Sequence, residues 1–320
     1  MCGGDQQHPN PPHVSEDLWQ HIHDVHCHVI DTPDTLPLLR PSCNDIKTTK
    51  LWIMGTKPDD WDIVQTCSIE YGSRVVSAFG IHPWFAHTIQ NPTVSLDSLK
   101  SRLELNSSAL VGEIGLDGVA THTGTSTKYD MDTQYSLFTQ QWVIAASLKR
   151  PVSIHAVGCF GRLEGFFKEQ LEGVPKDLSK KQRHMLKKAR ELDEEREERD
   201  PNTHPSLVKW PPAIMLHSYS GSTESIRNIL RYPTPVASRF YFSFSYFVNS
   251  RTPFERMKEK ILAVPDDRIL VESDLDNVGS VDDACALALD LVARAKGWTL
   301  EDAALRTGRN AVRFLSRVGV

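Results

Sequence analysis

The sequence predicts an α/β protein whose main domain is a (β/α)8 TIM barrel. Short apolar runs rich in Val, Ile and Phe alternate along the 320 residues with longer segments of helical periodicity, a pattern typical of βαβ units in a parallel sheet. Polar side chains that bind metals follow several of these runs, and barrel enzymes gather their functional groups at the C-terminal ends of the strands. An open, doubly wound sheet gives the same alternation, so the position of the polar groups is what favours the barrel.

Each apolar run is a candidate strand. The eight runs lie at residues 24–30, 51–54, 74–80, 110–114, 151–155, 213–217, 240–244 and 268–272. Helices are predicted at residues 131–149, 281–296 and 300–318. In the first of these, Leu137, Trp142 and Ala145 fall largely on one face, as in an amphipathic helix that packs against a sheet.

Two segments look like additions to this scaffold. Residues 1–20 are rich in Pro, Gly and His, and we expect a flexible or loosely docked extension before a single domain at 21–320. Residues 169–205, between the fifth and sixth strands, run from basic KKQRHMLKKAR to acidic ELDEEREERD. This insertion is longer than an ordinary loop, and its charges predict a solvated helix stabilised by its own ion pairs. The alternative is a docking arm for a protein partner or nucleic acid.

The composition narrows the class of protein. A hydrophobic fraction of 40% and a charged fraction of 24% are typical of a globular chain, and the six cysteines form no C-x-x-C pair. No apolar run approaches the roughly 20 residues that span a bilayer, and the first residues lack a secretion signal, so we expect a cytoplasmic or nuclear protein without membrane contact. The net charge of -5 does not indicate a general nucleic-acid binder. A polyanionic substrate would need a local cationic site, such as bound metal.

Metal ligands are predicted where the strands end. His26 and His28 lie two residues apart on one strand, so their side chains share a face, whereas Cys27 points the other way and packs. Four further candidates follow later apolar runs: Glu113 in LVGEIGLD, His155 in PVSIHAVG, His217 in AIMLHSYSG and Asp274 in RILVESDLD. A single histidine at a strand end is ordinarily a partnered polar residue. Their recurrence at several strand ends predicts a convergent site, and the mixed donors suit Zn, Mg or Mn.

The ordered set of motifs resembles the TatD-type metal-dependent DNases of the amidohydrolase superfamily. The motifs are DVHCHVID, FGIHPW, VGEIGLD, PVSIH, LHSYSG, VESD and GRNAVRFL, and they cover essentially the whole chain outside the two additions. The resemblance implies a two-metal hydrolase acting on phosphodiester bonds. By the same resemblance, one ion's ligands are His26, His28, Glu113 and Asp274, and the other's are Glu113, His155 and His217.

The resemblance also suggests roles in catalysis. Two cations about 3.5–4 Å apart activate a shared water, with Glu113 as the bridge and Asp274 as the group that orients the water and takes its proton. His82, in FGIHPW, matches a family position close to the substrate phosphate, although a capping or packing role ahead of Pro83 is the alternative. Trp84 could stack on a base, but aromatic residues after a strand are more often core, and we assign it no role in the site.

Three departures from the family pattern bear on the substrate. Val157 stands where many members have an Arg that clasps phosphate, and Arg162, a few residues on, could compensate. Asp276 replaces a common Pro, and Gly118 replaces an aromatic residue. We expect metal binding to persist and substrate recognition to differ. DNA cut from an end is the leading substrate, with a smaller phosphoester next. The alternatives are an amide or ester hydrolase without phosphate specificity, or a barrel that binds a protein partner through the charged insertion.

Overall fold

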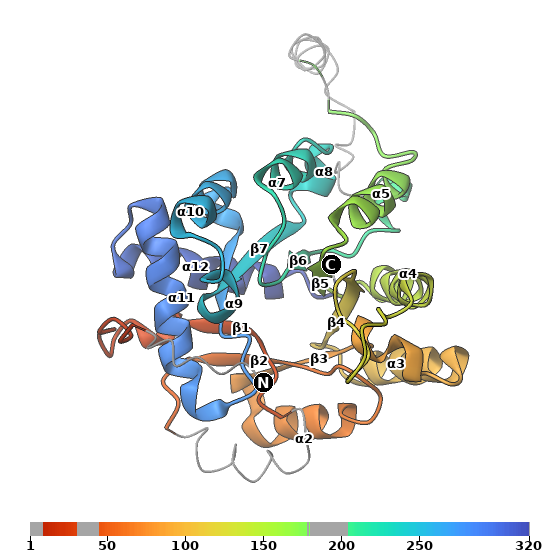
Figure 1. The fold of residues 1–320 in the computed structure, drawn as a ribbon, viewed down its shortest axis with the longest axis horizontal. Helices are drawn as coiled ribbons and strands as arrows, with labels where there is room; N and C mark the ends of the chain where they lie inside the picture. The colour runs from red at the N-terminus through yellow and green to blue at the C-terminus, as the bar shows by residue number, and fades with distance from the viewer. Residues whose placement is uncertain (1–8, 31–44, 178, 180–203, 320) are drawn as a thin grey trace, which may run out of the picture.

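In a computed structural model, residues 9–30, 45–177, 179 and 204–319 are described. Eight strands form one sheet in which each pairs in parallel with its neighbour in sequence, from β1 to β8 (Figure 1). The strands are β1 His23–Cys27, β2 Lys50–Met54, β3 Val75–Phe79, β4 Leu110–Asp117, β5 Val152–Val157, β6 Ile214–Leu216, β7 Phe240–Ser245 and β8 Ile269–Glu272. This order confirms the predicted TIM barrel.

Backbone hydrogen bonds just beyond the strands link the first strand to the last. The Asp274 amide donates to the His26 carbonyl at 3.0 Å, and the His28 amide donates to the Leu275 carbonyl at 2.8 Å. These bonds close the ring at the C-terminal ends of β1 and β8. They also bring Asp274 beside the two histidines of the first strand, although about 250 residues separate them in the chain.

Helices form a ring around the strands, as Figure 1 shows. They are α2 Trp61–Tyr71, α3 Pro92–Leu105, α4 Met131–Ser147, α5 Phe160–Gln170, α7 Thr223–Leu230, α8 Thr234–Ala237, α9 Tyr246–Asn249, α10 Phe254–Ala263, α11 Val281–Lys296 and α12 Leu300–Leu315. Short 3-10 helices are η1 Trp19–His21, η3 Gly72–Arg74, η4 Pro83–Thr88, η6 Pro205–Leu207, η7 Asp266–Arg268 and η8 Val278–Ser280. Several begin at a side-chain cap: Asp130, for example, accepts from the Thr133 amide at the start of α4.

The strand sequence FYFSFS of β7 shows how the alternation divides the core. Phe240 packs outward against Phe167 of α5, whereas Tyr241 points inward and meets Phe314 of α12 at 5.2 Å between ring centroids. Trp52 of β2 reaches the same phenyl ring at 5.4 Å. The N-terminal end of the barrel is therefore closed by aromatic packing, which leaves the polar groups to the opposite end.

The predicted elements are found close to where the sequence placed them. The strands overlap all eight predicted runs, α11 has the predicted bounds, and β4 continues three residues past its predicted end. Val14 and Trp19, in the predicted N-terminal extension, are buried against the barrel. Most of the predicted charged insertion at 169–205 lies outside the described residues and stays a prediction. No helix in the described ranges combines the length and apolar character that crossing a bilayer requires.

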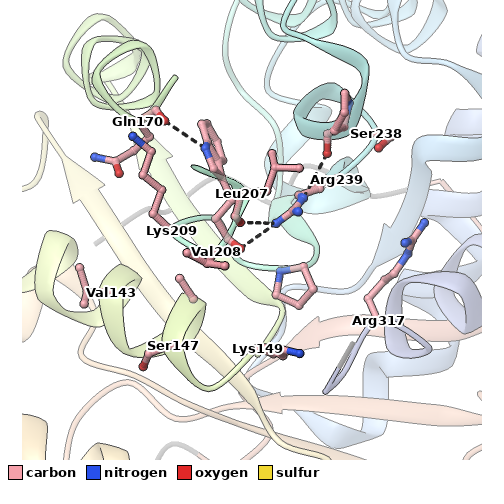
Figure 2. A pocket seen from close by; sticks show the side chains of 14 residues that line it. Val143, Ser147, Lys149, Gln170, Leu207, Val208, Lys209, Ser238, Arg239 and Arg317 are labelled. Atoms are coloured by element: carbon pink, nitrogen blue, oxygen red, sulfur yellow. Dashed lines mark hydrogen bonds between the residues drawn. The ribbon is translucent and has the colours of Figure 1, made fainter. Parts of the chain in front are cut away.

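Figure 2 shows a cavity of about 790 Å³. Its lining residues include Lys149, Pro212 and Arg239, which shortly precede β5, β6 and β7, so it lies at the N-terminal ends of these strands, away from the ends that carry the predicted ligands. Four cationic residues are among those that line it: Lys149, Lys209, Arg239 and Arg317. The Arg239 guanidinium donates to the backbone carbonyls of Trp210 at 2.7 Å and of Leu207 at 3.3 Å. No carboxylate is found among the described residues that line the cavity.

Candidate metal centre

All six predicted metal ligands meet at the C-terminal end of the barrel, with the Glu113 carboxylate at their centre. Its Oε1 lies 2.7 Å from His217 Nε2 and 2.8 Å from His155 Nδ1. Its Oε2 lies 3.2 Å from His28 Nε2 and 3.4 Å from His26 Nε2. Each carboxylate oxygen therefore faces a different pair of the four predicted histidine ligands, which is the arrangement that a bridging carboxylate requires.

Asp274 completes the side of the site formed by the first strand. Its Oδ1 lies 3.8 Å from His28 Nε2 and 3.9 Å from His26 Nε2, and its Oδ2 accepts from Ser218 Oγ at 3.0 Å. Asp274 and Ser218 both have positive φ, at 55° and 37°, which is costly for residues with a side chain. The surrounding hydrogen bonds hold both residues in this strained conformation at the two strand ends.

Glycine allows the fourth and fifth strands to approach closely enough to build the centre. A Cβ at Gly115, where φ is 149°, would lie 2.0 Å from the His155 carbonyl oxygen. No side chain fits at this position. The glycine between Glu113 and Asp117 therefore lets both carboxylates reach His155 from the neighbouring strand.

Hydrogen bonds on the far side of the imidazoles select the nitrogen that faces the centre. His26 Nδ1 is 2.9 Å from Ser153 Oγ, which leaves Nε2 toward Glu113. His155 Nε2 is 3.2 Å from Asp117 Oδ2, which leaves Nδ1 toward Glu113. A metal-binding histidine commonly has its second nitrogen held in this way, because the bond fixes the tautomer and the ring orientation.

His82 contacts the same carboxylate but differs in its hydrogen bonding. Its Nε2 lies 3.2 Å from Glu113 Oε1, while its Nδ1 accepts from the Trp84 amide at 3.1 Å as the cap of η4. A neutral imidazole that accepts at Nδ1 carries its proton on Nε2. His82 is therefore the cap that the sequence offered as an alternative, and as a neutral imidazole it also donates a hydrogen bond toward Glu113.

Two buried carboxylates at the site were not identified from the sequence. Asp117, at the end of β4, accepts from the Trp84 indole at 2.7 Å in addition to its contact with His155. Glu272, at the end of β8, accepts from the Ser218 amide at 2.6 Å. The sequence did contain a signal for Asp117: it lies four residues after Glu113 on one strand, and such positions share a face of the sheet.

Burial and neighbouring charges shift the pKa values of Glu113 and of the histidines around it. Burial alone would raise the pKa of Glu113, but the charges of His82, His217 and His26 and a hydrogen bond from His155 hold it well below its usual value. Burial opposes a charge on His217 too, yet Glu113 raises the pKa of that imidazole well above its usual value. Burial lowers the pKa of His26, and that of His82 to about 4.

The donor set fits divalent cations. Four overlapping sets of three side chains have donor atoms within 4.8 Å of one another: His26 with Glu113 and His217, His26 with His28 and Asp274, His82 with Glu113 and His155, and His217 with Glu272 and Asp274. Imidazole nitrogens with carboxylate oxygens are the donors that Zn and Mn bind, and carboxylates also suit Mg. Clustered acids at this depth need a positive counter-charge, which a bound cation supplies.

The sequence profile of the TatD related DNase family matches residues 23–316. The chain belongs to this family. Cut9-interacting protein scn1 of Schizosaccharomyces pombe is 30% identical, over 92% of this chain and 98% of the relative. An uncharacterized deoxyribonuclease of Saccharomyces cerevisiae is 25% identical, over 91% of this chain and 98% of the relative. The family and the relative described as a deoxyribonuclease support a DNase-like hydrolase, and the clustered donors agree with the metal dependence of TatD enzymes.

Solved structures of TatD proteins share the fold. YjjV, a TatD homologue from Escherichia coli K12, superimposes with a TM-score of 0.66 at 17% identity, covering 92% of this chain and 98% of its own. A TatD family hydrolase from Entamoeba histolytica gives a TM-score of 0.63 at 13% identity, covering 92% of this chain and 97% of its own. At these identities the likeness concerns the barrel alone.

The structure shows the surroundings of the residues that depart from the TatD pattern. A Cβ at Gly118 would lie 2.6 Å from the Gly158 carbonyl oxygen, so the aromatic residue common there has no room. Arg162 does not replace the arginine missing at Val157, because its guanidinium donates to Asp132 at 2.6 Å and lies over the Tyr135 ring. Asp276 is exposed beside the centre.

Trp84 does not lie in the core, where aromatic residues after a strand are more often found. Its side chain is 45% exposed at the mouth of the centre. The reason is the hydrogen bond from its indole nitrogen to Asp117, which turns the polar edge of the ring inward and leaves a face toward solvent.

Proposed function

We propose that the protein is a metal-dependent phosphodiesterase, and specifically a deoxyribonuclease that cuts DNA from an end. The observation that carries the proposal is the Glu113 carboxylate, whose two oxygens face two separate pairs of histidines. Family membership supports the hydrolase, and a relative described as a deoxyribonuclease supports the substrate. Two divalent ions, each of them Zn, Mg or Mn, would account for the two histidine pairs, because each ion would bind one pair and one oxygen of Glu113.

The residues divide into two ligand groups. His26, His28, Asp274 and one oxygen of Glu113 would hold one ion, and His155, His217 and the other oxygen would hold the second. Bound cations would lower the pKa of a water and neutralise the phosphate charge. The four carboxylates gathered here would offset the charge of two dications with the histidines neutral: Glu113, Asp117, Glu272 and Asp274.

The protein's own groups can handle the proton and the phosphate. Asp274 keeps 15% of its side chain exposed, and its Oδ2 already accepts a hydrogen bond from Ser218, so its carboxylate can accept a proton from the attacking water. His82 Nε2 donates toward the centre and can do the same to a phosphoryl oxygen.

The test compares the metal-loaded wild-type protein with Asp274→Asn and a matched control, Asp276→Asn, on single-stranded DNA, double-stranded DNA, RNA, methyl p-nitrophenyl phosphate and a carboxylic ester. Loss of the proton acceptor should lower kcat on DNA by about 10² or more while DNA affinity changes little. The control removes the same charge from an exposed side chain two residues away and should retain the wild-type kcat. Intact DNA with the loaded wild-type protein would contradict the proposal, and cleavage of the ester alone would favour the non-phosphate hydrolase.

The salt dependence of DNA binding provides an independent check. Arg162 is paired with Asp132, and Val157 offers no charge, so arginine would supply few phosphate contacts near the centre. Affinity should therefore fall only shallowly as salt rises, compared with a basic nuclease.

Binding of a protein partner is a second candidate function, favoured by the relative named as a Cut9-interacting protein. The cationic cavity of Figure 2 could receive an acidic segment of such a partner, since Lys149 and Arg317 line it at the end of the barrel opposite to the metal centre. Arg317→Glu should then weaken the complex with an isolated partner while leaving DNA cleavage unchanged. Equal binding by both forms would remove the cavity from consideration.

A further inference from the structure

The Trp84 side chain is fixed in place although it is exposed. The indole Nε1 donates to Asp117 Oδ2 at 2.7 Å, and the backbone amide donates to His82 Nδ1 at 3.1 Å. Pro83 precedes it at the start of η4 and restricts the backbone further. The ring therefore keeps one orientation at the mouth, so that binding a flat ligand there costs little side-chain entropy.

The ring also lies directly beside the centre. Its centroid is 5.0 Å from that of His82 and 6.2 Å from that of His155, and both imidazoles contact Glu113. Both rings stand nearly edge-on to Trp84, at 88° and 71°. A ligand ring placed on the indole would thus sit next to a phosphate held at the centre.

The other tryptophans do not share this exposure. Five are buried: Trp19, Trp52, Trp61, Trp142 and Trp210. Trp298 is half-buried, and the Arg306 guanidinium lies over its ring at 4.8 Å. The 45% exposure of Trp84 therefore stands out among the seven tryptophans of the chain, and an exposed aromatic face in a polar mouth is a common mark of a binding surface.

A second aromatic group comes from the same two connections, after β3 and β4. His87 stacks on Tyr129 with ring centroids 4.8 Å apart, and His122 packs against Tyr129 at 4.4 Å. These connections thus offer aromatic surface, while the end of β5 has Val157 in place of the arginine that clasps phosphate in many family members. Rings bind bases, whereas an arginine at Val157 would have bound phosphate.

We propose that Trp84 is a specificity-determining residue that stacks on an unpaired nucleobase next to the scissile phosphate. This inference rests on the proposed nuclease function and adds to it the kind of DNA end that is preferred. Every base has a π-face, so the contact tolerates any sequence, but it requires a base that is not stacked within a duplex. Single-stranded or frayed ends are therefore the preferred substrates.

The test uses two single-stranded oligonucleotides that differ only at the terminal residue, which carries either a normal base or an abasic tetrahydrofuran unit. The wild-type protein should have a KM about 10-fold or more lower for the oligonucleotide with the base. Trp84→Ala should abolish this difference, and Trp84→Phe should retain much of it, because phenylalanine keeps a ring while losing the bond to Asp117. Trp298→Phe is the matched control and should behave as the wild type.

Binding is measured separately by tryptophan fluorescence. The contribution of Trp84 is the difference between the emission of the wild type and that of Trp84→Phe, which keeps the other six tryptophans. Quenching of this signal by the oligonucleotide with the base, and not by the abasic one, supports stacking even if the protein cuts no DNA. Equal KM values for the two oligonucleotides in the wild type would overturn the inference while leaving the nuclease function intact. A loss of kcat on both substrates in Trp84→Ala, with the KM ratio unchanged, would also overturn it, because Trp84 would then only position Asp117.

Discussion

Asp117→Asn should weaken metal binding although Asp117 has no direct place in the ligand set. The carboxylate accepts from four donors: His155 Nε2 at 3.2 Å, the Trp84 indole at 2.7 Å, and the Val119 and Ala120 amides at 2.8 Å each. An asparagine has one acceptor oxygen. If that oxygen stays with the two amides, its NH2 group faces both the indole N–H and His155.

The magnitude follows from the tautomer that this change imposes. An NH2 group that donates to His155 Nε2 moves the imidazole proton to Nδ1, the atom that lies 2.8 Å from Glu113. Nδ1 is then no longer a ligand. Loss of a charge-assisted hydrogen bond of about 1.5–3 kcal/mol corresponds to roughly a 10- to 100-fold loss of metal affinity, the range expected for such a partner.

The assay is competition for zinc against a chelator of known affinity, with elemental analysis of the purified proteins. Asp132→Asn is the matched control, because Asp132 is exposed at the start of α4 and forms an ion pair with Arg162 of α5. The ion near His155 should be lost first. An affinity within twofold of the wild type in Asp117→Asn would refute the proposed orientation of His155.

Further changes test the rest of the site and the fold. Glu113→Gln should lose more metal than His26→Ala, because Glu113 contacts both histidine pairs, and full occupancy by elemental analysis would contradict this. Zinc binding at pH 7 should release protons, because Glu113, against the effect of burial, raises the pKa of His217 well above its usual value and the protonated ring must lose its proton to bind. The affinity for zinc should accordingly fall as the pH drops through that pKa. Calorimetry in two buffers of different ionisation enthalpy measures the protons released, and a binding enthalpy that is the same in both buffers would contradict this prediction. In denaturant unfolding, Gly308→Ala should destabilise by about 1–3 kcal/mol, since its Cβ would lie 2.3 Å from the His21 carbonyl oxygen. Gly165→Ala, with no atom within 4 Å, should instead stabilise by about 0.5–1 kcal/mol, and equal effects would argue against the packing of α12 on η1.

The sequence by itself was sufficient to predict the strands and the set of side chains that meet at the C-terminal end of the barrel. Apolar runs located all eight strands, because each strand of a barrel is buried and its residues alternate between the helices and the interior. The same alternation placed His26 and His28 on one face, and the position of Glu113, His155 and His217 on or directly after such runs predicted their convergence.

Only the tertiary structure decided which residues surround these ligands. Periodicity tells which face a side chain occupies, but contact between Ser153 and His26, 127 residues apart, depends on strand register and on the order of strands in the closed ring. For the same reason the sequence could not show that Arg162 turns toward Asp132. The exposure of Trp84 depends on its bond to Asp117, 33 residues further along the chain, and no local pattern records a hydrogen bond over that distance.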